Sequence, residues 1–120
     1  MAVEIGGKGL VEVNLTIPQG TSLAFTIIHK DEDGNVIDHS QSEISMAFQS
    51  KDGNTTYDLS RYCTGTAAGV SASIPAGYTS ELPRGKLVWD IFAAMEGGGT
   101  YRLAYGGVSI VDTYALDEAQ

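Results

Sequence analysis

Hydrophobic and polar residues alternate along several short segments of this chain. In two of them, residues 11–17 and 42–49, the apolar positions are Val11, Val13, Leu15 and Ile17, and then Ile44, Met46 and Phe48. Successive side chains of a strand point to opposite faces, so each segment has one apolar face and one polar face. The pattern therefore predicts strands of an antiparallel sheet that turns one face to a core.

Further alternating segments follow along the chain, and turn-forming residues separate them. Further strands are expected at about 22–29, 36–38, 55–59, 70–74, 86–95 and 100–111. The sequences between them include Pro18-Gln19-Gly20, Asp33-Gly34-Asn35, Lys51-Asp52-Gly53-Asn54 and Glu96-Gly97-Gly98-Gly99. Such residues favour tight turns between strands. We predict an all-β fold, an antiparallel two-sheet β-sandwich of the immunoglobulin-like or jelly-roll-like type with about seven or eight strands.

The core of this sandwich is expected around its only tryptophan, Trp89, which is in phase with apolar neighbours on one strand face. The residues predicted to surround it are Val13, Phe25, Met46, Phe48, Ile74, Leu87, Ile91 and Leu103. Residues 60–68 are interpreted as a loop, and residues 75–85 as an ordered connection or one helical turn. The glycine pair at 106–107 suggests a bulge or bend in the last strand.

The chain divides into three parts by composition. Residues 1–9 hold three glycines and no periodic pattern, which predicts a flexible N-terminal arm. Residues 10–111 carry the strand pattern and form the β-sandwich domain. Residues 112–120 are acidic and are interpreted as a C-terminal tail that frays. A chain of 120 residues is long enough to bury a core without metals or disulfides.

Charge and cysteine content limit the possible functions. The formal net charge of −8 argues against binding to nucleic acid, which requires a basic surface. The single cysteine, Cys63, has no partner for an intrachain disulfide and is expected to be a small buried apolar residue. The N-terminus lacks the pattern of a signal peptide, and no segment has the length and apolarity of a membrane span, so we expect no membrane association.

No combination of residues predicts catalysis or cofactor binding. The chain has no nucleophile elbow, and its triple glycine at 97–99 opens no helix that could bind phosphate, so we expect a protein that is not an enzyme. The acidic turn with Asp31, Asp33 and Asp38 lacks the glycine and glutamate register of a calcium loop. His29 and His39 could face one another and bind a transition metal, but exposed histidines at strand ends are the preferred interpretation. No metal site is predicted.

Aromatic residues in the loops are the remaining candidate contacts. Tyr62 and Tyr78 lie outside the expected strands, so their rings are available to a protein partner or to a sugar. They are our candidate residues for partner or glycan contact.

A pattern of strand and turn residues runs through the C-terminal half, at Thr79, Leu82, Gly85, Trp89, Asp90, Ile91, Arg102, Leu103, Gly107, Val108 and Ile110. It consists of a Thr and a Leu before a Gly, an aromatic-x-Asp-Ile strand, a glycine-rich tip, and Arg-Leu-x-x-Gly-x-Val-x-Val. This pattern resembles one in small virion proteins of tailed bacteriophages. Ile17, Gly20 and Leu23 are similar to the strand entry of the same domains. The chain has Trp89-Asp90 where those proteins have Tyr-x-x-Asp or Tyr-Asp.

This resemblance implies a non-enzymatic structural component of a virion, in the tail, baseplate, fibre attachment or capsid decoration. Its partners would be other virion proteins, in a homo-oligomer or multi-copy assembly, and it would be made in the cytoplasm of a bacterial host. Two alternatives remain open: a carbohydrate- or receptor-binding β-sandwich module, and a bacterial immunoglobulin-like accessory domain.

Overall fold

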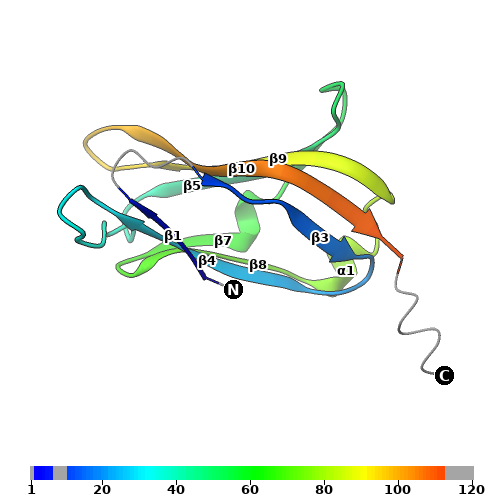
Figure 1. Cartoon of the computed structure of the whole chain (residues 1–120), viewed down its shortest axis with the longest axis horizontal. Coiled ribbons are helices and arrows are strands. Elements are labelled where there is room, and N and C mark those ends of the chain that lie inside the picture. Colours follow the sequence, from blue (N-terminus) through cyan, green and yellow to red (C-terminus); the bar gives the residue numbers. More distant parts are fainter. Residues whose placement is uncertain (1, 7–10, 113–120) are drawn as a thin grey trace.

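The structure, a computed structural model, describes residues 2–6 and 11–112 of the chain, and these residues form two β-sheets. Figure 1 shows the sheets one above the other, with their strands running along the long axis. The strands are β1 (Ala2–Gly6), β2 (Val11–Glu12), β3 (Leu15–Pro18), β4 (Leu23–Lys30), β5 (Glu43–Gln49), β6 (Thr56–Asp58), β7 (Cys63–Thr66), β8 (Gly69–Ile74), β9 (Gly85–Ala94) and β10 (Thr100–Val111). A 3₁₀-helix η1 (Ser60–Tyr62) and a four-residue helix α1 (Ala76–Thr79) complete the described elements.

The first sheet has four strands in the order β1-β4-β8-β7, and the second has six. In the second sheet, β10 lies between β9 on one side and both β2 and β3 on the other, and the order continues from β9 to β5 and β6. Short turns connect β5 to β6, β7 to β8 and β9 to β10, whereas the other neighbours come from separate parts of the chain. The prediction of an all-β protein is confirmed, and it is built from two sheets.

Two details of the predicted sheets were wrong. The sheets are not purely antiparallel, because β1 runs parallel to β4, and β2 and β3 run parallel to β10. A tight turn dictates antiparallel pairing only between consecutive strands, whereas β3 and β10 come from opposite ends of the chain. The described residues also contain ten strands, more than the seven or eight expected, because very short strands such as β2 leave little periodicity in the sequence.

Two segments predicted to be irregular have a different structure. Ala2–Gly6, expected to belong to a flexible arm, form β1 along the edge of β4, where backbone pairing stabilises them. The predicted loop 60–68 contains η1 and β7. Residues 7–9 and 113–120 lie outside the described residues, and Asp112, at the start of the predicted tail, is ion-paired with Arg84 at 2.6 Å. The expected helical turn in 75–85 is confirmed as α1.

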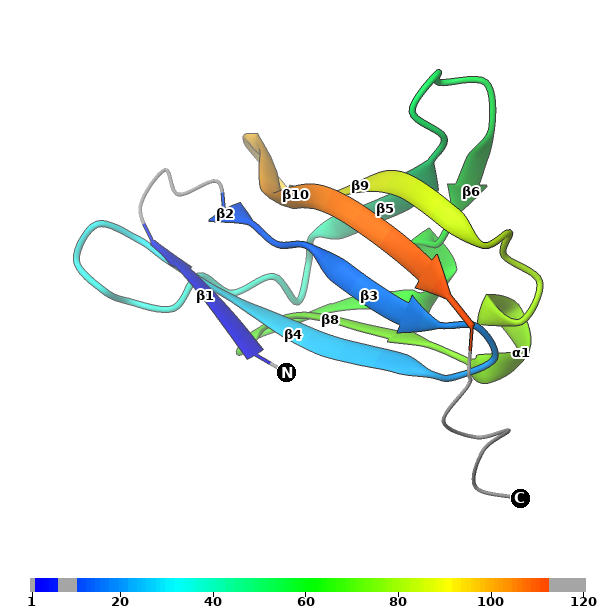
Figure 2. The ribbon, with the colours of Figure 1, turned by 45° about the vertical axis from the view of Figure 1, so that its right-hand side comes forward.

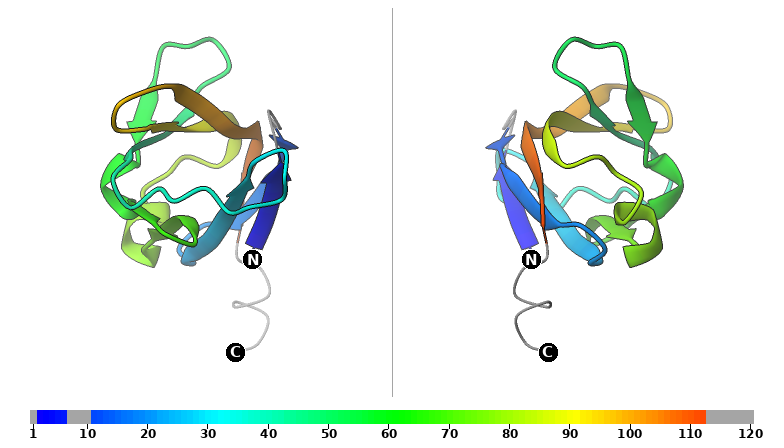
Figure 3. Two further views of the ribbon diagram at one scale, coloured as in Figure 1. Left: turned by 90° about the vertical axis from the view of Figure 1, so that its left-hand side faces the viewer. Right: turned by 90° about the vertical axis from the view of Figure 1, so that its right-hand side faces the viewer.

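Two of the predicted turns, 33–35 and 51–54, have a glycine in the left-handed region, with φ of +85° at Gly34 and +80° at Gly53. The first turn does not lead into a strand, since Val36 makes only a single bridge to Lys30. The second joins β5 to β6, and this hairpin stands away from its sheet in Figure 2. The view along the strands in Figure 3 shows the two layers and this projecting turn.

β10 keeps its register with β9 at the glycine pair, where Gly106 is opposite Trp89 and Gly107 is opposite Val88. The register shift of β10 against β9 lies between Arg102 and Ala104 instead. A Cβ at Gly106 would lie 2.1 Å from the backbone oxygen of Val13, so the glycine permits the chain between β2 and β3 to cross close to β10. The prediction of a bulge at this pair was wrong, because glycine serves here for close approach.

Trp89 is buried in the core, as predicted, and only 3% of its surface is exposed. Its ring meets Phe25 of the other sheet edge-on, with centroids 5.7 Å apart. The buried residues also include Met46, Phe48, Ile74, Leu87, Ile91 and Leu103, as expected. Val13 is only half-buried, because it lies where the chain crosses from β2 to β3 at the margin of the sheet.

Candidate functional site

A hollow with a volume of about 670 Å³ lies on the outer face of the six-stranded sheet. Its lining residues come from β2, β5, β6, β9 and β10, and they are Glu12, Ala47, Gln49, Thr56, Val88, Trp89, Asp90, Arg102, Tyr105, Gly106 and Gly107. The hollow has the size of a binding site for a small molecule or for a short peptide segment.

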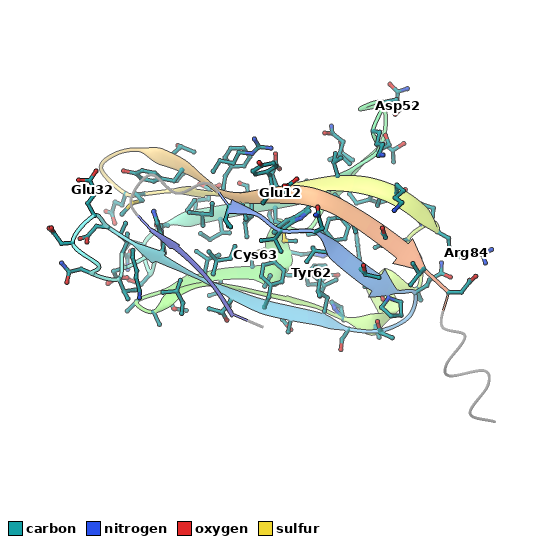
Figure 4. All side chains as sticks on the ribbon, in the orientation of Figure 1. Glu12, Glu32, Asp52, Tyr62, Cys63 and Arg84 are labelled. Atoms are coloured by element: carbon teal, nitrogen blue, oxygen red, sulfur yellow. The ribbon has the colours of Figure 1, made fainter. Side chains whose placement is uncertain are left out.

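Small residues make this face concave. Ala47 on β5 and Gly107 on β10 project little or no side chain above the sheet. At one side the β5–β6 hairpin rises above the sheet, and Asp52 lies near its tip in Figure 4. Glu12 of β2, also labelled there, bounds the opposite side. The depression is thus a property of the strand order and of the projecting hairpin.

Three side chains of β9 and β10, those of Asp90, Arg102 and Tyr105, form a polar cluster in this hollow. The Arg102 guanidinium lies 3.5 Å from the carboxylate of Asp90 and 4.8 Å from the centre of the Tyr105 ring. Both members of the ion pair are partly exposed, so the pair itself contributes little to stability. Val88 beside them is 37% exposed. The hollow therefore offers an apolar surface, an aromatic ring and charged groups of both signs.

The register shift in β10 brings these side chains to one face. Arg102 is opposite Phe92, and after the shift Tyr105 is opposite Asp90. The shift leaves Leu103 and Ala104 both buried, although they are consecutive, and so reverses the alternation between the two halves of the strand. Strict alternation would have placed Arg102 and Tyr105 on opposite faces. For this reason the sequence pattern did not reveal the site.

The two candidate tyrosines form a second cluster, at the junction of η1 and α1. Their ring centroids lie 5.5 Å apart in an edge-to-face arrangement. The guanidinium of Arg61 lies 4.8 Å from the centre of the Tyr62 ring and donates a hydrogen bond to the Tyr62 hydroxyl at 2.8 Å. The structure therefore brings Tyr62 and Tyr78 together, although they are sixteen positions apart in the sequence.

The side chains of this cluster are suited to contact with another surface and are not suited to proton transfer. Burial raises the pKa of the Tyr78 hydroxyl, which keeps it neutral. The hydrogen bond to Tyr62 raises the pKa of Arg61, which keeps it charged. Since Arg61 occupies one face of the Tyr62 ring, a sugar that stacked there would have to displace the guanidinium.

The carboxylates of Asp31 and Asp38 in the acidic turn accept hydrogen bonds from nearby backbone N–H groups. One oxygen of Asp31 accepts hydrogen bonds from the N–H groups of Asp33 and Asn35, at 2.9 Å each. Asp38 accepts a hydrogen bond from the N–H of Ser40 at 2.8 Å. The described part of the chain contains no group of three or more His, Cys, Asp or Glu side chains arranged to hold a metal ion.

The two histidines are buried, and the prediction of exposed strand-end residues was wrong. His29 is 2% exposed and His39 is fully buried, because the segment after the acidic turn folds back against β4 and β7. Their rings stack with centroids 5.2 Å apart, so the expectation that they could face one another is met.

Cys63 is half-buried, with its sulfur 3.7 Å from Met46 Sδ and 3.6 Å from the Leu59 carbonyl oxygen. Burial raises the pKa of this thiol to about 11. The thiol is therefore almost entirely protonated at neutral pH, which is the state of an unreactive cysteine.

Comparisons with known proteins give no assignment. No protein-family model matches the chain, and no curated protein matches it. Among residues 2–6 and 11–112, no helix has the length and apolarity needed to cross a membrane.

Proposed function

We propose that this protein is a non-enzymatic structural component of a tailed-bacteriophage virion. Its two sheets would form an immunoglobulin-like or jelly-roll-like β-sandwich that acts through protein–protein assembly in several copies. The hollow on the six-stranded sheet would be the surface on which another virion protein docks.

The residues that carry the resemblance to virion proteins fall into two groups. One group serves the fold. Thr79 is buried and donates a hydrogen bond to the Thr21 carbonyl oxygen at 2.7 Å, which ties α1 to the turn before β4. Leu82 is 2% exposed and Trp89 is 3% exposed. Similarity at these positions supports a similar architecture and says little about the partner.

The second group carries the proposal, because it lines the hollow. Asp90 and Arg102 both belong to the resembling pattern, and both line the concave outer surface. A core does not require a charged pair at this place. Polar residues of a shared pattern that meet at one exposed hollow are more readily explained by recognition of a partner than by folding.

A protein segment laid across this hollow would bury apolar surface from Val88 and from the half-buried Tyr105 ring. Each Å² of apolar area removed from water contributes roughly 25 cal/mol. Since many copies act together in a particle, modest affinity for each contact is sufficient for stable assembly.

The test is to look for the chain in tailed-phage particles from the host that carries its gene. We expect mass spectrometry to detect it in purified particles, and electron microscopy with a labelled antibody to place it at a defined position. Absence from every particle would refute the proposal.

Two variants then test the surface. Val88→Arg fills the hollow, and we expect it to abolish incorporation. Ser73→Arg is the matched control, because Ser73 is exposed on β8 of the other sheet, and it should be incorporated normally. A chain without residues 1–9 tests the arm, and equal incorporation would show that the arm has no assembly role.

A carbohydrate- or receptor-binding module is the second candidate, and the Tyr62–Tyr78 cluster favours it. Two rings with centroids 5.5 Å apart at the surface are a suitable contact for a sugar once Arg61 moves aside. A glycan array probed with the purified protein tests this function. Binding that is lost in Tyr78→Ala and retained in Val88→Arg would assign glycan recognition to the tyrosine cluster.

A further inference from the structure

The buried histidine pair lies away from both surfaces described above and closes one end of the molecule. His29 lies on β4, and His39 lies in the connection between β4 and β5. They are the only two histidines in the chain. His29 Nδ1 and His39 Nε2 are 3.0 Å apart, which is hydrogen-bond distance.

The pair requires a particular protonation state. A hydrogen bond between two imidazole nitrogens needs one N–H and one lone pair, so at least one of the two facing nitrogens must be unprotonated. The other nitrogen of His39, Nδ1, lies 2.8 Å from Ser42 Oγ. Both contacts of His39 are therefore compatible with a neutral ring. Burial lowers the pKa of His39, and charge repulsion from His29 lowers it further.

We propose that His29 and His39 form a pH-sensitive latch, which holds residues 36–42 against the two sheets at neutral pH and releases them when the pair is protonated.

Protonation acts in two steps. The first proton places a charge on a ring pair that is almost completely buried, which is unfavourable because the charge loses its hydration. The second makes both facing nitrogens N–H donors, so that the hydrogen bond becomes a repulsive contact. Both steps favour a conformation in which the rings reach water.

Charged and aromatic side chains on neighbouring elements affect how readily His39 accepts a proton. Asp38 raises the pKa of His39, but less than burial lowers it, and its carboxylate is exposed and hydrogen-bonded to Ser40. Tyr101 of β10 meets the His29 ring edge-on at 5.5 Å. Glu96 lines a small surface hollow together with Asp38 and Ser42. Lys30 follows His29 in β4 and adds a positive charge to this end of the strand.

Backbone hydrogen bonds at both histidines and the bridge between Val36 and Lys30 hold the segment that would be released. The N–H of Ile37 donates to the His29 carbonyl oxygen at 2.7 Å, and the N–H of His39 donates to the Thr66 carbonyl oxygen of β7 at 2.9 Å. A Cβ at Gly65 would lie 2.0 Å from the His39 oxygen, so the two backbones touch. Release would uncover the inner side of β7 at the end of the molecule shown on the left in Figure 1.

Amide hydrogen exchange of the full chain, followed by NMR, tests the latch. The readout is the protection of the Ile37 and His39 amides, corrected for intrinsic exchange. The Leu59 amide, bonded to Met46 at a different place in the fold, is the internal reference. Between about pH 7 and pH 5 we expect protection of the two latch amides to fall by about tenfold or more, while Leu59 changes little. The His39 imidazole signal should titrate below the ordinary value of about 6.5.

Two variants identify the titrating groups. Glutamine donates and accepts hydrogen bonds but does not titrate in this range, so His29→Gln and His39→Gln should each reduce the pH dependence of protection, and the double variant should abolish it. Unchanged protection of the latch amides in the unsubstituted chain at about pH 5 would overturn the proposal. So would ordinary titration of the His39 imidazole, or the same pH dependence in the double variant.

Discussion

The indole Nε1 of Trp89 donates a hydrogen bond to the backbone carbonyl oxygen of Val13 at 2.7 Å, across 76 positions of the sequence. The same carbonyl lies where the chain crosses from β2 to β3 beside β10. Trp89 therefore fills the core with its ring and fixes the path of the N-terminal strands with its nitrogen.

Trp89→Ala should lower the free energy of unfolding by about 3–5 kcal/mol, as large aromatic truncations do in well-packed cores. Trp89→Phe keeps most of the ring but leaves the Val13 carbonyl without its indole donor, and it should cost about 1–3 kcal/mol. Urea denaturation followed by circular dichroism measures both. Equal losses for the two variants would show that the hydrogen bond, rather than the ring volume, dominates.

Gly106→Ala should destabilise the protein by about 1–3 kcal/mol, because its Cβ would lie 2.1 Å from the Val13 oxygen and force the backbone to move. Gly107→Ala is the matched control. Its nearest contact would be the Asn14 side-chain oxygen at 3.4 Å, so it should cost less than about 1 kcal/mol. Thermal unfolding of the two variants measures the loss of stability in each. A larger loss for Gly107→Ala would contradict the close approach at Gly106.

The Cys63 thiol should react slowly with an aromatic disulfide reagent at about pH 8. Its pKa of about 11 leaves few molecules as thiolate, and the sulfur is half-buried. We expect a rate about two orders of magnitude below that of the unfolded chain in urea. Equal rates in the folded and unfolded protein would show that the thiol is accessible and ionised.

The acidic turn should not bind Ca²⁺ tightly. One oxygen of Asp31 already serves two backbone N–H groups, and Gly34 is out of register for a calcium loop. Isothermal titration calorimetry should detect no micromolar binding. Micromolar binding that is lost in Asp33→Ala would contradict this prediction.

The alternation of side chains was sufficient to predict the all-β class and most of the core. Leu87, Trp89 and Ile91 are buried because every second residue of a strand faces the same way, and this rule needs no knowledge of neighbouring strands. The hairpin glycines Gly34 and Gly53 were identified for a similar local reason, since a positive φ is a property of the turn itself.

What the sequence by itself determined is thus local: strands, turns and one helical turn. Only the tertiary structure decided the parallel pairing of β3 with β10, the burial of His29 and His39, and the hollow that joins Asp90 to Arg102. Each depends on which distant segments become neighbours. The physical reason is that strand order, and the register shift in β10, arise from the packing of whole sheets, whereas alternation and turn preference act within a few residues.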